Sequence, residues 1–101
     1  LLLILVGIVF LPCFLDDDPA AVTVERVADH IEHAAAVAGP GAVALGSDFD
    51  GFEDPPPRGL EDVSRLPALA EALARRGFSE PDIRAIFGGN FLRAWRAITA
   101  G

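Results

Sequence analysis

The residues best suited to chemistry are two carboxylates in the segment Gly46-Ser47-Asp48-Phe49-Asp50-Gly51. The segment follows a short apolar run that is expected to form a strand, and functional residues of parallel α/β folds gather where strands end. In an extended chain Asp48 and Asp50 would face the same side, and the flanking glycines would let the backbone approach a ligand. Such carboxylates serve as metal ligands or as general acids and bases. Capping of the loop through Asx turns remains an alternative.

A calcium-binding loop is a competing interpretation of the same residues. With Gly51 at the sixth position of an EF-hand, Asp48 and Asp50 fall at the third and fifth. Gly46 and Pro57 then occupy the first and twelfth positions, where an EF-hand requires carboxylates. The segment therefore does not fit a calcium loop.

Histidine and cysteine provide a second set of candidate ligands. His30 and His33 lie on a predicted helix, but a helical zinc pair prefers a spacing of four residues together with a third ligand. We therefore interpret both histidines as surface or packing residues. Cys13 is the sole cysteine, so no disulfide can form within the chain, and we interpret it as a buried or inert thiol.

The composition limits the classes of protein to which the chain can belong. Its 101 residues make at most one domain, and a hydrophobic content of 51% excludes a disordered chain. The net charge is −7, from 15 acidic and 8 basic residues. A nucleic-acid surface needs a basic stripe, so this acidity argues against one.

The N-terminal segment from Leu1 to Leu15 is apolar throughout and permits two interpretations. As a helix it would span about 22 Å, which is short of the ~30 Å hydrocarbon core of a membrane. An unbroken apolar run is typical of a fully buried parallel strand, the interpretation that we favour, and a targeting segment stays open. No convincing signal peptide or transmembrane helix is found, so the localisation is unknown, with the cytoplasm as the default for a bacterial protein.

The elements expected along the chain begin with a strand–helix–strand unit and end with helices. They are a strand over residues 2–10, a helix over 24–38, a strand over 42–47, and helices over about 66–76, 80–87 and 91–99. Thr23, Ser79 and Asn90 are expected to cap three of these helices. The two strands must be parallel, and two parallel strands leave open edges on both sides. The sequence is therefore inferred to be truncated, with further strands upstream.

Four segments, taken together, resemble the membrane dipeptidase (renal dipeptidase-like) family of metallopeptidases. In order they are Val27-Ala28-Asp29-His30-Ile31-Glu32-His33, Gly46-Ser47-Asp48-Phe49-Asp50-Gly51, Gly59-Leu60-Glu61-Asp62-Val63-Ser64 and Gly88-Gly89-Asn90-Phe91-Leu92-Arg93. The resemblance runs from about Ile8 onward. It implies an α/β fold, the C-terminal part of a (β/α)₈ TIM-type barrel consisting of its last two parallel strands and closing helices. One departure is Arg58, which stands where the family commonly has an acidic residue.

The resemblance also implies a chemistry for the parent enzyme. Family enzymes hydrolyse dipeptides, and some hydrolyse β-lactam rings, with two zinc ions that activate a water and polarise the scissile carbonyl. Asp48 matches the last-strand aspartate that is held to shuttle the proton of this water to the leaving amine. Phe14 matches an often aromatic position that borders the substrate pocket. The family's zinc ligands belong to earlier strands, and the resemblance places none of those positions in this chain. His30 and His33 match a family motif but are not among its metal ligands.

On this basis we expect an incomplete metallo-dipeptidase that is inactive alone, because one carboxylate without the metals cannot generate the nucleophile. The expected partners are a dipeptide substrate and the upstream rest of the barrel, with no nucleic acid and with a homodimer left open. The alternative is a non-catalytic α/β structural or binding module that oligomerises through its open sheet edges.

Overall fold

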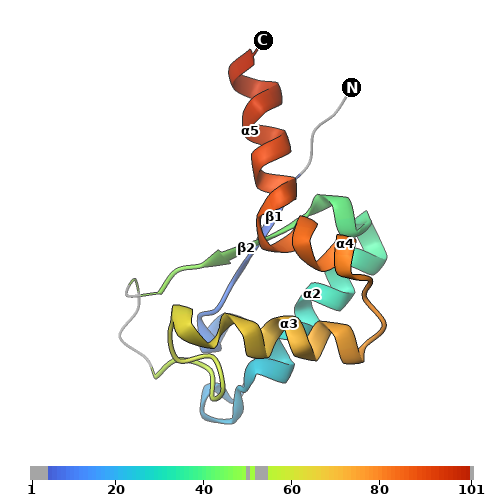
Figure 1. Cartoon of the computed structure of the whole chain (residues 1–101). Coiled ribbons are helices and arrows are strands. Elements are labelled where there is room, and N and C mark those ends of the chain that lie inside the picture. Colours follow the sequence, from blue (N-terminus) through green and yellow to red (C-terminus); the bar gives the residue numbers. More distant parts are fainter. Residues whose placement is uncertain (1–4, 50, 52–54, 101) are drawn as a thin grey trace.

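The computed structural model describes residues 5–49, 51 and 55–100, and its central feature is a two-stranded parallel sheet. Strand β1 (Val6–Val9) pairs with β2 (Val43–Ser47), and α2 (Val24–Ala38) lies between them in the sequence (Figure 1). The predicted parallel pairing within a mixed α/β fold is therefore confirmed.

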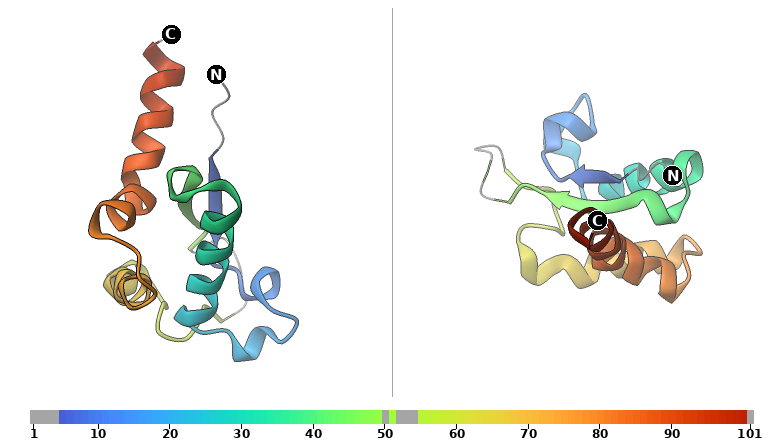
Figure 2. Two further views of the ribbon diagram at one scale, coloured as in Figure 1. Left: turned by 90° about the vertical axis from the view of Figure 1, so that its right-hand side faces the viewer. Right: turned by 90° about the horizontal axis from the view of Figure 1, so that it is seen from above.

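Short helical segments occupy the connections, and three helices follow the sheet. They are α1 (Pro12–Leu15), η1 (Pro19–Ala21), η2 (Pro40–Ala42), η3 (Val63–Arg65), α3 (Leu66–Arg75), α4 (Glu80–Arg84), the π-helical η4 (Ala85–Gly89) and α5 (Asn90–Ala100). Seen from above, the α1 turn lies beyond β1, and α3 and α4 lie beyond β2 (Figure 2). Helix α2 packs directly against α3, to which ion pairs join it. Helix α5 projects away from the remaining elements (Figure 1).

The first strand differs from its prediction in length and in burial. It covers only Val6–Val9 of the predicted residues 2–10, and residues 1–4 lie outside the described part of the chain. The expectation of a fully buried strand is wrong for this chain, because Val6 and Gly7 are exposed and Ile8 and Val9 are only half-buried. Among the residues that the structure describes, only β2 pairs with this strand, and its other edge has no neighbouring strand.

Two of the three predicted helix caps need correction. Ser79 caps α4 as expected, since its hydroxyl accepts a hydrogen bond from the backbone N–H of Asp82 at 3.2 Å. Thr23 occupies the N-cap position of α2, but its side chain makes no capping bond. Asn90 is not a cap, because its backbone is already helical (φ −65°, ψ −43°) and its amide is used elsewhere. The predicted helix 80–87 changes at Ala85 into η4, which contains a kink at Gly88.

One hydrophobic core lies between α2, α3 and the sheet. In α2, Val27, Ala28 and Ile31 are buried at the spacing of a single helix face. The buried members of the core come from several elements: Phe10, Leu15, Val22, Val27, Ala28, Ile31, Val43, Leu60, Leu69, Ala72, Leu73 and Ile86. The core therefore holds the helices against the sheet and fixes the path of the chain around both strand ends.

Charged side chains join α2 to α3 at the rim of this core. Arg76, directly after α3, contacts Asp29 at 2.6 Å and Glu25 at 3.0 Å, and Arg75 contacts Glu25 at 2.9 Å. Hydrogen bonding to Arg76 lowers the pKa of Glu25 below its ordinary value of 4.5. Burial raises the pKa of Asp29, but its hydrogen bond with Arg76 and the other favourable charges lower it overall below 3.8.

Within residues 5–49, 51 and 55–100, no helix combines the length and the apolar character needed to cross a membrane.

Candidate functional site

The candidate site lies at the edge of the sheet where both parallel strands end. The backbone N–H of Phe10, the residue after β1, donates to the carbonyl of Ser47 at 2.9 Å. This bond extends the pairing of the strands by one step and holds the end of β2 in place. Asp48 follows immediately and is exposed, as a carboxylate that meets a substrate must be.

A β-bulge precedes Asp48. Ile8 pairs with Leu45, but the next residue, Val9, pairs with Ser47, so Gly46 is an extra residue in β2. A Cβ atom added to Gly46 would lie 3.3 Å from the carbonyl oxygen of Ile8, so a side chain there would push the strands apart. A bulge bends its strand and redirects the residues that follow. The direction in which Asp48 leaves the sheet therefore depends on Gly46.

The backbone turns left-handed at the end of β2. Ser47 has a φ of 33° and Asp48 a φ of 64°, whereas residues other than glycine rarely have positive φ values. The N–H of Gly51 donates to the carbonyl of Asp48 at 3.0 Å and closes the turn. The premise of an extended chain beyond Asp48 is therefore wrong, and Asp50 lies outside the described residues. Such backbone strain is concentrated at functional sites in proteins.

Gly51 leaves the space that the Asp48 carboxylate occupies. A Cβ atom at Gly51 would lie 2.8 Å from Cγ of Asp48 and would overlap its Oδ1. From the sequence, this glycine was expected to let the backbone approach a ligand. In the structure it also sets the position of the carboxylate, because any side chain at residue 51 would displace it.

Two aromatic rings lie beneath this turn. The rings of Phe10 and Phe49 pack edge to face, with centroids 5.3 Å apart and planes at 74°. Phe10 is fully buried and Phe49 is half-buried, so the pair links the turn to the core. Sequence reasoning missed both residues as supports of the site. The signal was an aromatic residue directly after β1 and another directly after Asp48.

Phe14 lies at the same edge of the sheet as Asp48, on the α1 turn that follows β1. Its side chain is 71% exposed, whereas its neighbours Pro12 and Leu15 are buried. Cys13, in the same turn, is exposed, so of the expectation of a buried or inert thiol the burial is wrong and the inertness stays a prediction.

The two histidines line one pocket together with Arg26 and Asp29, but they differ in their contacts. His30 contacts the backbone carbonyl of Leu15 through Nε2 at 2.8 Å, and His33 is exposed on the next turn of α2. Across the described ranges 5–49, 51 and 55–100, no three His, Cys, Asp or Glu side chains are grouped closely enough to hold a metal ion. These residues alone therefore do not make a metal site.

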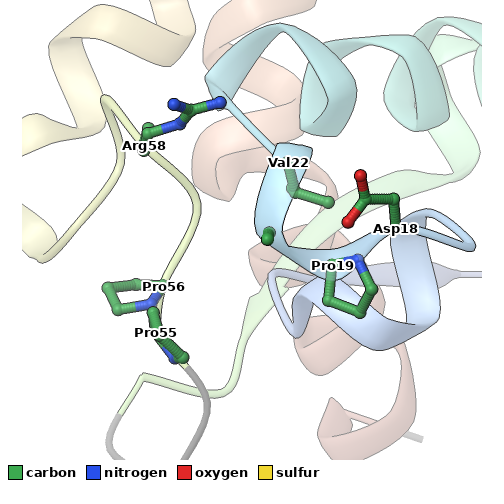
Figure 3. Close-up of a pocket in the computed structure, with 7 residues that line it drawn as sticks. Asp18, Pro19, Val22, Pro55, Pro56 and Arg58 are labelled. Atoms are coloured by element: carbon green, nitrogen blue, oxygen red, sulfur yellow. The ribbon is translucent and has the colours of Figure 1, made fainter.

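A pocket of about 490 Å³ lies between η1 and the loop that follows β2 (Figure 3). In Figure 3, Pro55 and Pro56 form one wall and Pro19 and Val22 the other. Two backbone hydrogen bonds connect the walls. The N–H of Arg58 donates to the carbonyl of Val22 at 3.0 Å, and the carbonyl of Arg58 accepts from the N–H of Val24 at 2.8 Å. Neither predicted site residue lines this pocket.

Comparison with known proteins identifies the family. Residues 4–100 match the sequence profile of a family described as membrane dipeptidase, peptidase family M19. An uncharacterized dipeptidase of Schizosaccharomyces pombe is 44% identical over 88 residues, which are 86% of this chain and 21% of that protein. The dipeptidase tcpJ of Claviceps purpurea is 38% identical over 94 residues, 93% of this chain and 22% of that protein.

Solved structures give the same result. A crystal structure of an amidohydrolase from Pseudomonas aeruginosa aligns with a TM-score of 0.81 at 25% identity, over 91% of this chain and 35% of that one. The dipeptidase AC, a metallopeptidase of family M19, aligns with a TM-score of 0.76 at 37% identity, over 86% of this chain and 26% of that one. The chain thus spans only about a fifth of the curated relatives it matches. Since the profile covers nearly all of its residues, the chain belongs to the membrane dipeptidase family, peptidase family M19.

Proposed function

We propose that this chain is the C-terminal part of a zinc-dependent dipeptidase, in which Asp48 is the proton shuttle for hydrolysis of the peptide bond of dipeptides. The observation that carries the proposal is an exposed carboxylate at the end of β2, held by a left-handed turn, in a chain of the M19 family. The proposal includes the fold: β1 and β2 are the last two strands of a (β/α)₈ barrel, and upstream strands pair with their free edges.

The metals come from outside this chain in our proposal. We assign the zinc ligands to upstream strands of the barrel, as the resemblance to the family implies. The described residues contain no cluster of three candidate ligands. When bound, two zinc ions polarise the scissile carbonyl and lower the pKa of the attacking water. The isolated chain is therefore inactive.

Asp48 contributes the acid–base step. A carboxylate oxygen of Asp48 accepts the proton that the attacking water loses as its oxygen bonds to the scissile carbon. Asp48 then donates this proton to the nitrogen of the leaving amine as the carbon–nitrogen bond breaks. Its exposed position and the fixed turn around it suit a group that must meet two substrate atoms in succession.

Phe14 provides a contact for the substrate. Its exposed ring lies on the turn after β1, at the same edge of the sheet as Asp48. Aromatic side chains offer a large rigid surface against which an apolar side chain of a dipeptide can pack. We assign it to substrate binding and not to the chemical step.

A chimera tests the proposal. The matching segment of the M19 dipeptidase AC is replaced by this chain, and dipeptide hydrolysis and bound zinc are measured. We expect the chimera to hydrolyse dipeptides, the chain alone to be inactive, and Asp48→Asn to lower kcat at least about a hundredfold with two zinc ions retained. Near-normal turnover in the Asp48→Asn chimera, or activity of the chain alone, would contradict the assignment. An inactive chimera, with this chain forming a stable oligomer alone, would favour the non-catalytic module.

A further inference from the structure

Two side chains of α2 converge on a single backbone carbonyl at the end of α1. Nε of Arg26 donates to the carbonyl oxygen of Leu15 at 2.9 Å, and Nε2 of His30 contacts the same oxygen at 2.8 Å. Residues four apart lie one above the other on a helix, so Arg26 and His30 can both form a hydrogen bond with the same oxygen atom. Because a carbonyl oxygen only accepts, Nε2 of His30 must carry the hydrogen.

The carbonyl of Leu15 needs such partners. Leu15 is the last residue of α1. The last carbonyls of a helix accept no hydrogen bond from an N–H of the same helix. Donors and positive charges at a helix C-terminus are favourable for the same reason. Arg26 is itself held between two carboxylates, since it contacts Asp16 at 3.2 Å and Asp29 at 3.5 Å.

The α1 turn depends on contacts outside itself. It has only four residues, too few for an isolated helix to be stable in water. The buried side chains of Pro12 and Leu15 anchor it on the core side. The two donors from α2 anchor its final carbonyl, and the exposed Phe14 lies between these anchored positions.

We propose that Arg26 and His30 are positioning residues, which hold the α1 turn so that Phe14 presents its ring to the dipeptide. This inference rests on the proposed function. It gives His30 of the segment His30-Ile31-Glu32-His33 a role other than metal binding, and it leaves the exposed His33 outside that role.

The test uses the active chimera. We expect His30→Leu to raise KM for a dipeptide with an apolar side chain about fivefold, the effect of losing one hydrogen bond, while kcat and zinc content stay unchanged. His30→Gln should keep a KM near that of the parent, because its amide nitrogen can reach the position of Nε2. The matched control is His33→Leu, three residues along the same helix, which should leave KM unchanged.

A double-mutant cycle separates positioning from a loss of stability. Phe14→Ala should raise KM by itself, and adding His30→Leu to Phe14→Ala should raise it no further, because His30 acts through Phe14. Independent effects of the two changes, or equal losses in His30→Gln and His30→Leu, would overturn the inference. If His30→Leu does not fold, Arg26→Met removes the other donor, and unchanged KM in that variant would overturn it as well. Failure of the proposed function would appear differently, as a parent chimera that hydrolyses no dipeptide.

Discussion

At the scale of single residues, the end of β2 combines strain with several local restraints. Positive φ values at residues other than glycine cost on the order of 1–3 kcal/mol each, and Ser47 and Asp48 both have them. The bond from Phe10 to Ser47 and the bond from Gly51 to Asp48 hold this conformation. The restraints act on the backbone on both sides of Asp48, so the direction in which its side chain leaves the backbone is set before a substrate arrives.

Gly51→Ala tests this arrangement. The added methyl group would overlap the Asp48 carboxylate and displace it, and a misplacement of about 1 Å can lower a rate about a hundredfold. We expect kcat of the chimera to fall by that order with bound zinc unchanged, measured by initial rates and zinc analysis. Gly41→Ala is the control, because a Cβ atom there would make only an ordinary contact, 3.9 Å from Arg93. Equal activity in the two variants would contradict the role given to Gly51.

At the scale of elements, the described fold depends on ties between segments far apart in the sequence. The fully buried Asn90 is the strongest example. Its amide nitrogen donates to the carbonyls of Pro40 at 2.7 Å and Val43 at 2.8 Å, and its oxygen accepts from Arg93 at 3.0 Å. One side chain at the start of α5 therefore satisfies two carbonyls beside the beginning of β2.

Asn90→Ala should destabilise the protein strongly. The change leaves the buried carbonyl of Val43 and the part-buried carbonyl of Pro40 without their donor, at a cost of about 2–4 kcal/mol in the free energy of unfolding. Urea denaturation of the purified protein measures this loss. Thr99→Ala, which removes an exposed hydroxyl bond within α5, is the control and should change stability by less than about 0.5 kcal/mol. Similar losses of unfolding free energy in both variants would show that the hydrogen bonds of Asn90 do not stabilise the fold in this way.

The ties between α2 and α3 predict a dependence of stability on pH. The pKa values of Glu25 and Asp29 are lowered in the folded chain, so these carboxylates stabilise it fully above their ordinary values of 4.5 and 3.8. This contribution is lost as the pH falls below those values and through the lowered pKa values of the folded state.

Arg76→Met removes the largest of the interactions that lower these two pKa values, and Arg75 and Arg26 keep part of the effect. Because about half of each carboxylate side chain is exposed to solvent, we expect a loss of only about 1–2 kcal/mol near neutral pH, which shrinks as the solution is acidified to about pH 3. Denaturation of parent and variant across this pH range measures the difference. Arg65→Met, which removes only a surface pair with Glu61 at 3.9 Å, is the control and should cost little at any pH. A loss in Arg76→Met that stays constant with pH would contradict the assignment.

These elements also show what local sequence patterns can predict. The cap at Ser79 was predictable because its partner, Asp82, is three residues away. The role of Asn90 was not, because its partners lie 47 and 50 residues away and no local pattern encodes them. The position of Asp48 after a strand followed from hydrophobic patterning. The bulge at Gly46 and the left-handed turn did not, since they depend on the register against β1.

At the scale of the whole molecule, the described chain leaves much apolar surface uncovered. The large hydrophobic side chains exposed among the described residues include Val6 and Phe14 near the sheet and a group on α5: Phe91, Leu92, Trp95 and Ile98. In the described part of the chain the sheet has two strands, and each has one edge without a neighbouring strand. The solved relatives are about three to four times as long as the matched segment, which agrees with further structure covering these surfaces.

Assembly with an upstream segment should therefore bury this surface. We expect the chain alone to bind the dye ANS, which fluoresces on exposed apolar surface, and to lose most of that signal when the upstream portion of the dipeptidase AC is added. Trp95 is the sole tryptophan of the chain and is 58% exposed, so its fluorescence reports on the same event if the upstream portion carries Trp→Phe substitutions. Restored dipeptide hydrolysis in the same mixture would tie burial to activity. ANS binding that is unchanged by the upstream portion, with the chain sedimenting as a self-associated species, would instead show that these surfaces are covered by copies of the chain itself.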